Sequence, residues 1–382
     1  MSRQEREVVA GVDVIAVQSR EEMQAFIDLP WTVYQADANW IPPIKAHLAR
    51  LLNPGEHPFW RQARRELFLA RRGRQVVGRI AALVDEGYRR YQGEKMGGWG
   101  FFECLQDPEA AGALFVQAES WARRQGAEFL RGPLNPSLNY EAGLLVQGFE
   151  ARPTLMMTYN PPYYLDLVRF SGFRKEKDLL AYHFSLEHEP PAWTYDVGRR
   201  LLEKEAVTIR RMEPKRFEEE VRLLTDIYND SWAHNWGFSP ITLEESREMV
   251  RELLPVAEPD LAFFILHRNE PVGVCIIIPD LNPLLRRFNG KLGLSALIKR
   301  HLYWKEITGL RGLIFGVKEQ YRQMGLPLAA FYHLLAVVER NPQYRYVELG
   351  WNLEDNDAIN RLYEEGGLRP SKRYRLYRKA LQ

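Results

Sequence analysis

The order of secondary-structure signals repeats once along this chain of 382 residues, and that repeat limits the folds that the chain can adopt. In each half an apolar hairpin is followed by a strand, a helix, a second strand, a short helix that stops at glycine and a closing strand. Gly78 and Gly273 are 195 residues apart, and so are Gly172 and Gly367. The matching elements between these glycines are not all 195 residues apart, so insertions in the two halves must cancel in length between the glycines. We interpret the pattern as an internal duplication of an α/β unit; chance similarity of two α/β halves is the alternative.

The predicted elements are short runs bounded by glycine, proline or charged turns. In the first half they are a strand at 13–17, a helix at 21–29, a hairpin at 66–82, a strand at 97–104, a helix at 108–125, a strand at 128–133, a helix at 161–168 and a strand at 179–184. In the second half they are a hairpin at 261–278, a strand at 312–317, a helix opening near 328, a strand at 346–352, a helix after 356 and a strand at 374–378.

One stretch of the second half, residues 312–328, joins a buried strand to a helix through a polar turn. The first amides of a helix have no partner inside it, and the helix dipole adds partial positive charge there. Arg322 lies in the turn, and Gly325 would let a ligand approach the backbone closely. This geometry suits a pyrophosphate group; an ordinary strand–turn–helix without a ligand is the alternative.

These residues resemble the signature Gln/Arg-x-x-Gly-x-Gly/Ala with which the GNAT superfamily of N-acetyltransferases binds the pyrophosphate of acetyl-CoA. Arg322 and Gly325 match the signature, whereas Pro327 departs from it because proline has no N–H to offer a phosphate. The next strand and helix, with Asn356 and Tyr363, are also similar to the family pattern. Leu368 stands where the family usually has an aromatic residue.

The resemblance implies an α/β fold with mixed sheets. It predicts two tandem GNAT-like acyl-CoA N-acyltransferase domains, each with a central twisted mixed sheet flanked by helices. We expect a degenerate domain without the CoA signature at residues 1–190 and a domain carrying the acyl-CoA site at residues 205–382. At the matching helix start in the first half, Asp107 and Glu109 would repel a phosphate. One CoA per chain is therefore expected, and the first half would support or complete the acceptor cleft.

The resemblance also implies roles for individual residues. Acyl transfer would be direct: an uncharged amine attacks the thioester of acetyl-CoA or of a longer acyl-CoA, and a strand N–H stabilises the oxyanion. Tyr363 matches the family's proton donor to the departing thiolate; packing on the core is the alternative. Cofactor contacts are expected from Phe315, Gly316, Val317, Arg322, Gln323, Met324, Gly325, Leu326, Pro327, Leu328, Asn352 and Asn356.

The general base is expected at His234 or Glu319. Histidine can accept a proton near neutral pH, and His234 lies in an aromatic segment where the family keeps its acceptor-binding helix and loop. Glu319 lies beside the phosphate turn. A structural histidine and a solvated turn glutamate are the alternatives.

Composition and charge argue against several other classes of protein. A formal net charge of +2 gives no electrostatic basis for nucleic-acid binding. Cys104 and Cys275 lie in separate apolar runs, which predicts buried free thiols rather than a disulfide or a metal site. The sequence shows neither an apolar run of about 18 residues nor a signal-peptide core, so we expect a cytoplasmic protein.

An insertion at residues 282–305 is longer than the turn that such a core needs. Its apolar residues fall on one helical face and basic residues accompany them, as follows: Leu294, Leu297, Ile298 and Leu302, with Lys291, Lys299, Arg300 and Lys305. This pattern predicts an amphipathic helix, which either contacts lipid or packs on the first half.

Over its whole length the chain resembles a bacterial group of tandem GNAT-like proteins of mostly unassigned activity, some of which are thought to acylate lipid amines. That resemblance rests on residues 99–103, 132–135 and 159–164. It implies an N-acyltransferase that acts on a small-molecule or lipid amine, and lipid contact through the insertion would add weak peripheral contact with a membrane. A non-catalytic module that binds CoA or a partner is the alternative. The sequence does not identify the acceptor, the acyl length or the oligomeric state.

Overall fold

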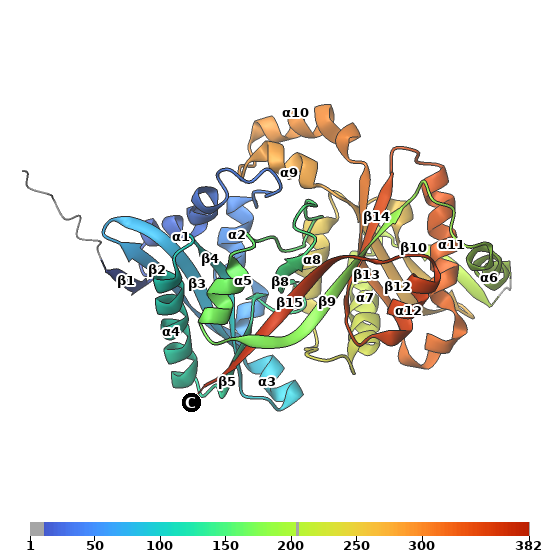
Figure 1. Ribbon diagram of the computed structural model, residues 1–382. Coiled ribbons are helices and arrows are strands. Elements are labelled where there is room, and N and C mark those ends of the chain that lie inside the picture. The colour runs from blue at the N-terminus through green and yellow to red at the C-terminus, as the bar shows by residue number, and fades with distance from the viewer. Residues whose placement is uncertain (1–10, 204–205, 382) are drawn as a thin grey trace, which may run out of the picture.

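The computed structural model describes residues 11–203 and 206–381, apart from the side chains of 294–297. Its strands form one sheet of thirteen strands that runs through both halves, and helices cover both faces of this sheet (Figure 1). The order of paired strands is β1-β2-β3-β4-β5-β15-β9-β14-β13-β12-β11-β10, and β8 pairs with β15 beside this path. The predicted mixed α/β architecture is therefore confirmed, although the two expected sheets are joined into one.

The strands are β1 Val12–Ala16, β2 Ala63–Arg72, β3 Gln75–Asp85, β4 Met96–Cys104, β5 Phe129–Gly132, β8 Leu144–Gln147, β9 Arg174–Ser185, β10 Val207–Arg211, β11 Ala262–His267, β12 Glu270–Pro279, β13 Gly309–Val317, β14 Tyr346–Leu353 and β15 Pro370–Ala380. A separate small sheet pairs β6 Leu134–Asn135 with β7 Glu141–Ala142.

The α-helices are α1 Arg20–Val33, α2 Lys45–Leu51, α3 Glu86–Gln92, α4 Pro108–Arg124, α5 Tyr164–Phe170, α6 Ala192–Glu203, α7 Phe217–Trp232, α8 Leu243–Leu253, α9 Asn282–Phe288, α10 Leu294–Tyr303, α11 Leu326–Glu339 and α12 Asp357–Glu365. In the described residues, short 3₁₀ helices accompany them: η1 Pro58–Arg61, η2 Pro214–Arg216, η3 Pro259–Leu261, η4 Trp304–Glu306 and η5 Glu319–Met324.

The predicted elements are confirmed, and the differences in their bounds have local causes. Helix α1 is longer than expected because Ser19 and Glu22 form a capping box at its start and because it continues past Pro30. Helix α5 begins three residues later than expected, at Tyr164, since a residue that precedes proline avoids the helical region. The polar turn after β13 is a 3₁₀ helix, η5.

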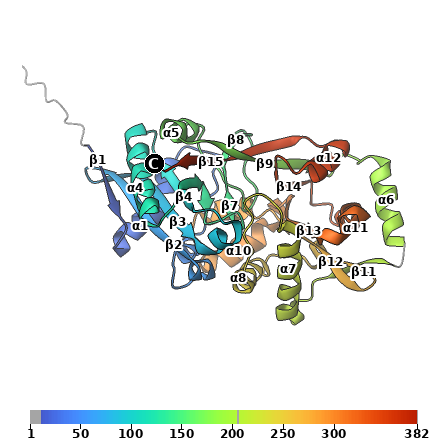
Figure 2. The same cartoon turned by 90° about the horizontal axis from the view of Figure 1, so that it is seen from below.

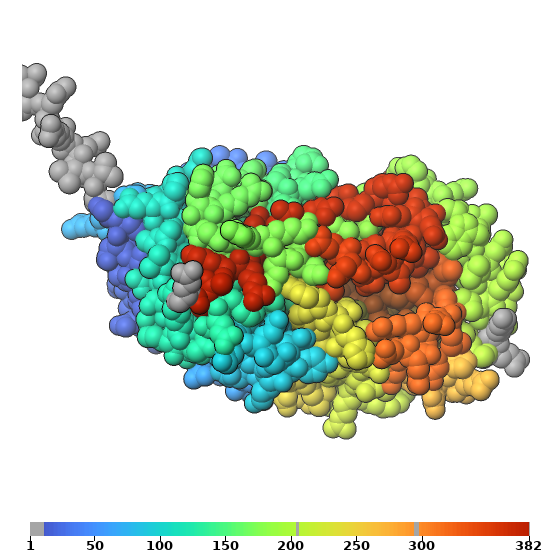
Figure 3. Space-filling view, turned by 60° about the horizontal axis from the view of Figure 1, so that its bottom comes forward, coloured from blue at the N-terminus to red at the C-terminus, as the bar shows by residue number. Residues whose placement is uncertain are grey.

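The closing strands of the two halves change places. Strand β9 of the first half pairs with β14 of the second, with Tyr182 opposite Leu349, and β15 lies between β5 and β9. Figures 1 and 2 show β15, in red, crossing from the second half to the first, and in Figure 3 its residues lie among those of the first half at the surface. The halves therefore cannot separate without breaking strand pairs. The expected division at 190–205 coincides with α6 and stays a prediction.

Helix α6 also explains why α11 is apolar around most of its circumference. The sheet covers one side of α11, and α6 packs on another. The two helices cross so closely at Gly198 that a Cβ there would lie 2.4 Å from the carbonyl oxygen of Leu328. The start of α11, which carries the expected anion site, is thus fixed by packing on two sides.

Two helix layers cover opposite faces of the second-half sheet. Successive side chains of a strand point to opposite faces, so Cys275 and Ile277 of β12 pack in the core with α11, whereas Ile276 packs in the core with α7. Both cysteines are buried free thiols, as predicted. No helix within residues 11–203 and 206–381 is long and apolar enough to cross a membrane.

Candidate functional site

The two central parallel strands of the second half, β13 and β14, separate midway along their length. They pair from Gly309 opposite Tyr346 to Gly312 opposite Leu349, where the pairing ends. The register between β12 and β13 shifts at the same level, between Ile276 and Ile277. Alternate residues of β13 beyond Gly312 therefore direct backbone N–H and C=O groups towards the gap instead of towards a strand.

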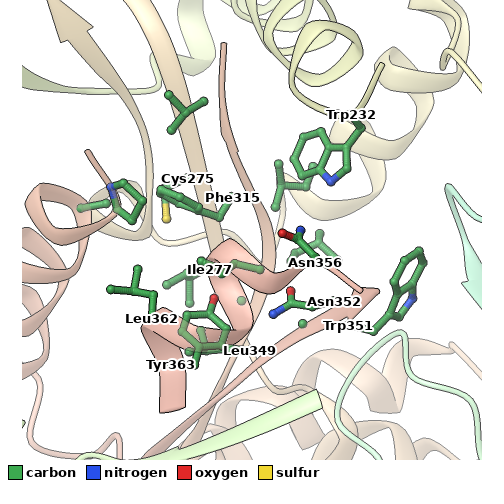
Figure 4. Close-up of a pocket in the computed structure, with 18 of the residues that line it drawn as sticks. Trp232, Cys275, Ile277, Phe315, Leu349, Trp351, Asn352, Asn356, Leu362 and Tyr363 are labelled. Atoms are coloured by element: carbon green, nitrogen blue, oxygen red, sulfur yellow. The ribbon is translucent and has the colours of Figure 1, made fainter. Parts of the chain in front are cut away.

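A cavity of about 580 Å³ occupies this gap (Figure 4). Its wall includes Cys275 and Ile277 from the face covered by α11, and Trp232 and Ile314 from the face covered by α7. The cavity therefore passes through the sheet between the separated strands. Two substrates could approach one point from opposite faces of the sheet, and the volume lies in the usual range of small-molecule sites.

The turn that was expected to bind pyrophosphate forms part of the cavity wall. Gly325, with φ of 70°, precedes α11, and no side chain caps this helix. A left-handed φ favours glycine here, and the uncapped first turn leaves backbone donors and the positive end of the dipole for an anion. Arg322 also lines the cavity, and its Nη2 donates to the carbonyl oxygen of Ser231 at 2.6 Å. That bond ties the turn to the end of α7.

Most of the expected cofactor residues come together at the cavity. Those that line it are Phe315, Val317, Arg322, Gly325, Pro327, Leu328, Asn352 and Asn356. Those that do not are Gly316, Gln323, Met324 and Leu326. Leu326 is fully buried in the core under α11, and a Cβ at Gly316 would lie 2.7 Å from the ring of Trp232. Contact of any of these residues with a cofactor stays a prediction.

Tyr363 lies on α12 and lines the cavity. Figure 4 shows its hydroxyl directed away from the helix towards the cavity. Its ring packs edge-on against Tyr182 at a centroid distance of 5.1 Å, and burial raises the pKa of Tyr363 above its ordinary value. The phenol therefore keeps its proton at neutral pH, which a proton donor requires.

Two asparagines at the end of β14 line the cavity beside Tyr363 (Figure 4). Asn356 precedes α12, and its side chain makes no capping hydrogen bond, so its amide is available for a ligand. The amide of Asn352 donates to Oδ1 of Asn360 at 3.2 Å, and Asn360 in turn donates to the carbonyl of Leu353. This chain of bonds holds the orientation of Asn352.

Cys275 also lines the cavity, but it is unsuited to act as a nucleophile. Burial raises the pKa of its thiol to about 12, so the reactive thiolate is scarce at neutral pH. The site accordingly favours direct transfer between two bound substrates over a covalent acyl-cysteine intermediate.

The two residues expected as general base are placed together, but outside the cavity. Nε2 of His234 lies 3.3 Å from Oε2 of Glu319, and both side chains are exposed. Neither lines the cavity. His234 lies just after the end of α7 at Trp232 with its side chain at the surface, and the N–H of Glu319 donates to Oδ1 of Asp230 at 2.7 Å. Both side chains thus lie outside the cavity wall, and a role for either as general base stays a prediction.

A different carboxylate lies behind the cavity wall. Tyr140, from the loop between β6 and β7 of the first half, lines the cavity, and its hydroxyl lies 3.1 Å from Oε1 of Glu245 on α8. Glu245 is buried, and burial raises the pKa of its carboxyl although Thr242 and Tyr140 donate to it. A carboxylate with a raised pKa is the better proton acceptor near neutral pH. Sequence reasoning missed this pair because its members are 105 residues apart.

The first half thus contributes directly to the cavity wall. Leu138, Asn139, Tyr140 and Met156 of the first half line it together with Tyr228 and Met249 of the second. The hydroxyl of Tyr228 donates to Oδ1 of Asn139 at 2.9 Å, so the two halves are also bonded to each other beside the cavity. This part of the wall is mainly apolar.

A buried ion pair lies in the strands next to the cavity. Lys372 of β15 pairs with Glu348 of β14, and Thr154 of the first half donates to Glu348 at 2.7 Å. Arg311, which is buried and lines the cavity, donates to backbone carbonyls of Gly312 and Glu348. Residues of both halves therefore pack around the position along β13 and β14 at which the two strands separate.

Two curated relatives align with nearly the whole chain. Protein YghO of Escherichia coli K12 is 32% identical over 382 residues, covering 95% of this chain and 94% of that protein. A bacterial ceramide synthase of Caulobacter vibrioides is 34% identical over 383 residues, covering 97% of this chain and 98% of that protein. No protein-family model matches the chain.

Solved structures share the fold over the same length at low sequence identity. A tandem GNAT protein from the clavulanic acid biosynthesis pathway superposes with a TM-score of 0.56 at 11% identity, covering 97% of this chain and 99% of that one. A GCN5-related N-acetyltransferase from Sphaerobacter thermophilus superposes with a TM-score of 0.53 at 16% identity, covering 97% and 96%. Both likenesses concern the fold and extend through both halves.

Proposed function

The chain belongs to the tandem GNAT-fold N-acyltransferases that include Protein YghO and bacterial ceramide synthase, and from that premise we propose that it transfers a long acyl chain from acyl-CoA to the amine of a lipid. Acyl-CoA-dependent N-acylation follows from the family itself. The acyl length and the lipid acceptor are the proposal. Its main support is the cavity that passes through the sheet and is closed by apolar residues of both halves.

The acyl-CoA is proposed to enter from the face covered by α11. Its pyrophosphate would bind at the uncapped start of α11 near Arg322, and Asn356 would contact the pantetheine arm in the gap between β13 and β14. The amide groups of the arm can then form hydrogen bonds with the backbone N–H and C=O groups that β13 presents beyond Gly312, as an added β-strand would. This arrangement places the thioester where the strands separate.

The lipid acceptor is proposed to enter from the opposite face, where the wall includes Leu138, Met156, Trp232 and Met249. Each methylene that such a wall removes from water contributes about 0.8 kcal/mol, so an apolar wall selects long-chain substrates. The ceramide synthase among the relatives suggests a sphingoid base as the class of acceptor.

Four groups of the chain are proposed to carry out the transfer. Glu245 accepts the proton of the ammonium through the Tyr140 hydroxyl, and the neutral amine then attacks the thioester carbon. A backbone N–H of β13 beyond Gly312 stabilises the oxyanion that forms. As the carbon–sulfur bond breaks, Tyr363 donates its proton to the thiolate, and its phenolate then takes the remaining extra proton of the attacking nitrogen, so that the products are CoA with a free thiol and a neutral amide.

A substrate series tests this proposal. We would measure kcat/KM for acetyl-, octanoyl- and palmitoyl-CoA, each with sphinganine and with ethanolamine as the amine. Because about 0.8 kcal/mol per methylene corresponds to about a fourfold change, kcat/KM should rise by several orders of magnitude from acetyl to palmitoyl. Equal or better turnover of acetyl-CoA and ethanolamine would refute the lipid assignment and leave N-acyltransferase activity intact.

A variant of the cavity wall gives a second, independent readout. Met249→Trp should reduce kcat/KM for sphinganine and leave that for ethanolamine nearly unchanged, because the larger ring fills space on the acceptor side of the cavity. A uniform loss with both amines would instead indicate damage to the fold, and circular dichroism would separate the two cases.

A further inference from the structure

The segment around α9 and α10 concentrates positive charge. Residues 281–305 contain six lysine and arginine residues and no aspartate or glutamate. Because the whole chain carries +2 and this segment +6, the rest of the chain carries −4. Acidic Glu306 follows the segment, but Arg287 holds it in an ion pair at 2.7 Å. The remaining basic residues are Arg286, Lys291, Lys299, Arg300 and Lys305.

The same segment exposes large apolar side chains. Leu292, Ile298 and Leu302 are 62%, 63% and 64% exposed. Ile298 and Leu302 are one helical turn apart and therefore share a face of α10. The side chains of Leu294 and Leu297, which were expected on that face, lie outside the described part of the chain. Most large apolar side chains elsewhere in the described chain are buried or half-buried, so this local exposure needs an explanation.

The exposed face belongs to a segment that is held in place from behind. Nε1 of Trp31 donates to Oδ1 of Asn289 at 2.8 Å, and the N–H of Lys45 donates to the carbonyl of Gly290 at 3.0 Å. Nζ of Lys299 donates to the carbonyl of Arg287 at 2.9 Å, which joins α10 to α9. The α9 end of the insertion thus packs on the first half, whereas α10 lies at the edge of the molecule (Figure 1) and exposes Ile298 and Leu302; contact with lipid stays a prediction.

We propose that this surface, defined by Leu292, Ile298 and Leu302 with the surrounding basic residues, docks the protein on an anionic lipid bilayer. Apolar side chains would enter the interface while lysine and arginine face lipid phosphates, the arrangement of a helix that lies in the plane of a membrane. Helix α10 has 10 residues and is about 15 Å long, so it lies on the bilayer and does not cross it. The inference holds whichever amine is acylated, because it concerns the surface and not the cavity.

Vesicle sedimentation of the full chain tests this surface. We expect the protein to sediment with vesicles of phosphatidylcholine and phosphatidylglycerol at low salt, and to remain in solution with phosphatidylcholine alone. At about 1 M salt, where charge screening acts within about 3 Å, the sedimented fraction should fall at least tenfold. Equal sedimentation with neutral vesicles, or none with anionic ones at low salt, would overturn the proposal.

Three variants locate the contact. Ile298→Glu with Leu302→Glu should reduce sedimentation at least tenfold, whereas the control pair Val116→Glu with Phe170→Glu, at 60% and 80% exposed positions of the first half, should not. Lys291→Gln with Lys305→Gln removes two positive charges and should lower sedimentation at low salt severalfold. If Ile298→Glu with Leu302→Glu fails to fold, the variant Lys291→Gln with Lys305→Gln still tests the proposal. Unchanged sedimentation of the folded variants, or a dimer in light scattering that Ile298→Glu dissociates without any vesicle binding, would refute the proposal.

Discussion

Breaking the buried ion pair between Lys372 and Glu348 should destabilise the protein strongly. The side chains of Lys372 and Glu348 are 4% and 1% exposed, and both are removed from water. In Lys372→Met, Glu348 keeps its hydrogen bond from Thr154 but loses its charged partner. Removing one member of a buried pair costs about 3–5 kcal/mol. Because Arg311 interacts electrostatically with Glu348, we expect the lower end of this range.

The magnitude converts into a measurable change in melting temperature. For 382 residues the entropy of unfolding is about 0.8 kcal/mol/K, so a loss of about 3 kcal/mol lowers Tm by about 4 °C. Differential scanning calorimetry can resolve this shift. The double variant Lys372→Met with Glu348→Gln should recover part of it, since neither position of the pair then carries a charge and the amide can still accept from Thr154, although Arg311 loses its interaction with Glu348.

A matched control removes a lysine from an exposed pair. Lys95 and Glu128 are 2.7 Å apart and both exposed, so Lys95→Met should change the free energy of unfolding by less than about 1 kcal/mol. If Lys372→Met lowered Tm no more than Lys95→Met does, the buried ion pair would not stabilise the strands beside the cavity. If the double variant melted as low as the single one, the loss would reflect packing and not an unpaired charge.

Three further predictions concern the reaction. Tyr363→Phe should lower kcat by about 10²-fold or more with nearly unchanged CoA affinity, and normal turnover would make Tyr363 a packing residue. Arg322→Ala should weaken CoA binding by roughly 1.5–3 kcal/mol, and calorimetry should find one CoA per chain; two sites, or unchanged affinity, would contradict the assignment. Glu245 accepts a proton only when ionised, and burial raises its pKa, so kcat/KM should rise with pH through that raised pKa. Glu245→Gln, which keeps the capping box with Thr242, should lose that pH-dependent rise together with most activity; an unchanged pH profile would exclude Glu245 as the base.

Local sequence was sufficient to predict many elements of this protein and several of the residues that line its cavity. Strands, helices and turns follow from the period of apolar residues and from glycine and proline, which act within a few residues. The strand–turn–helix of residues 312–328 is such a local unit, and the structure places Arg322 and Gly325 on the cavity wall as expected. Tyr363 was singled out by its match to the family pattern, and the structure places it on the cavity wall, whereas its role as proton donor stays a prediction.

Tertiary structure alone decided which distant residues share the cavity. The exchange of β9 and β15 depends on pairing between strands far apart in the chain, such as Tyr377 with Gly132, and no local pattern encodes that choice. Tyr140 meets Glu245 because the first-half loop packs against α8, whereas His234 and Glu319, attractive by residue type, meet at the surface. The type of each side chain and the local strands, helices and turns are set by the sequence itself. Burial of side chains and pairing of strands arise from contacts across the whole sheet, so the joined sheet determined which side chains line the site.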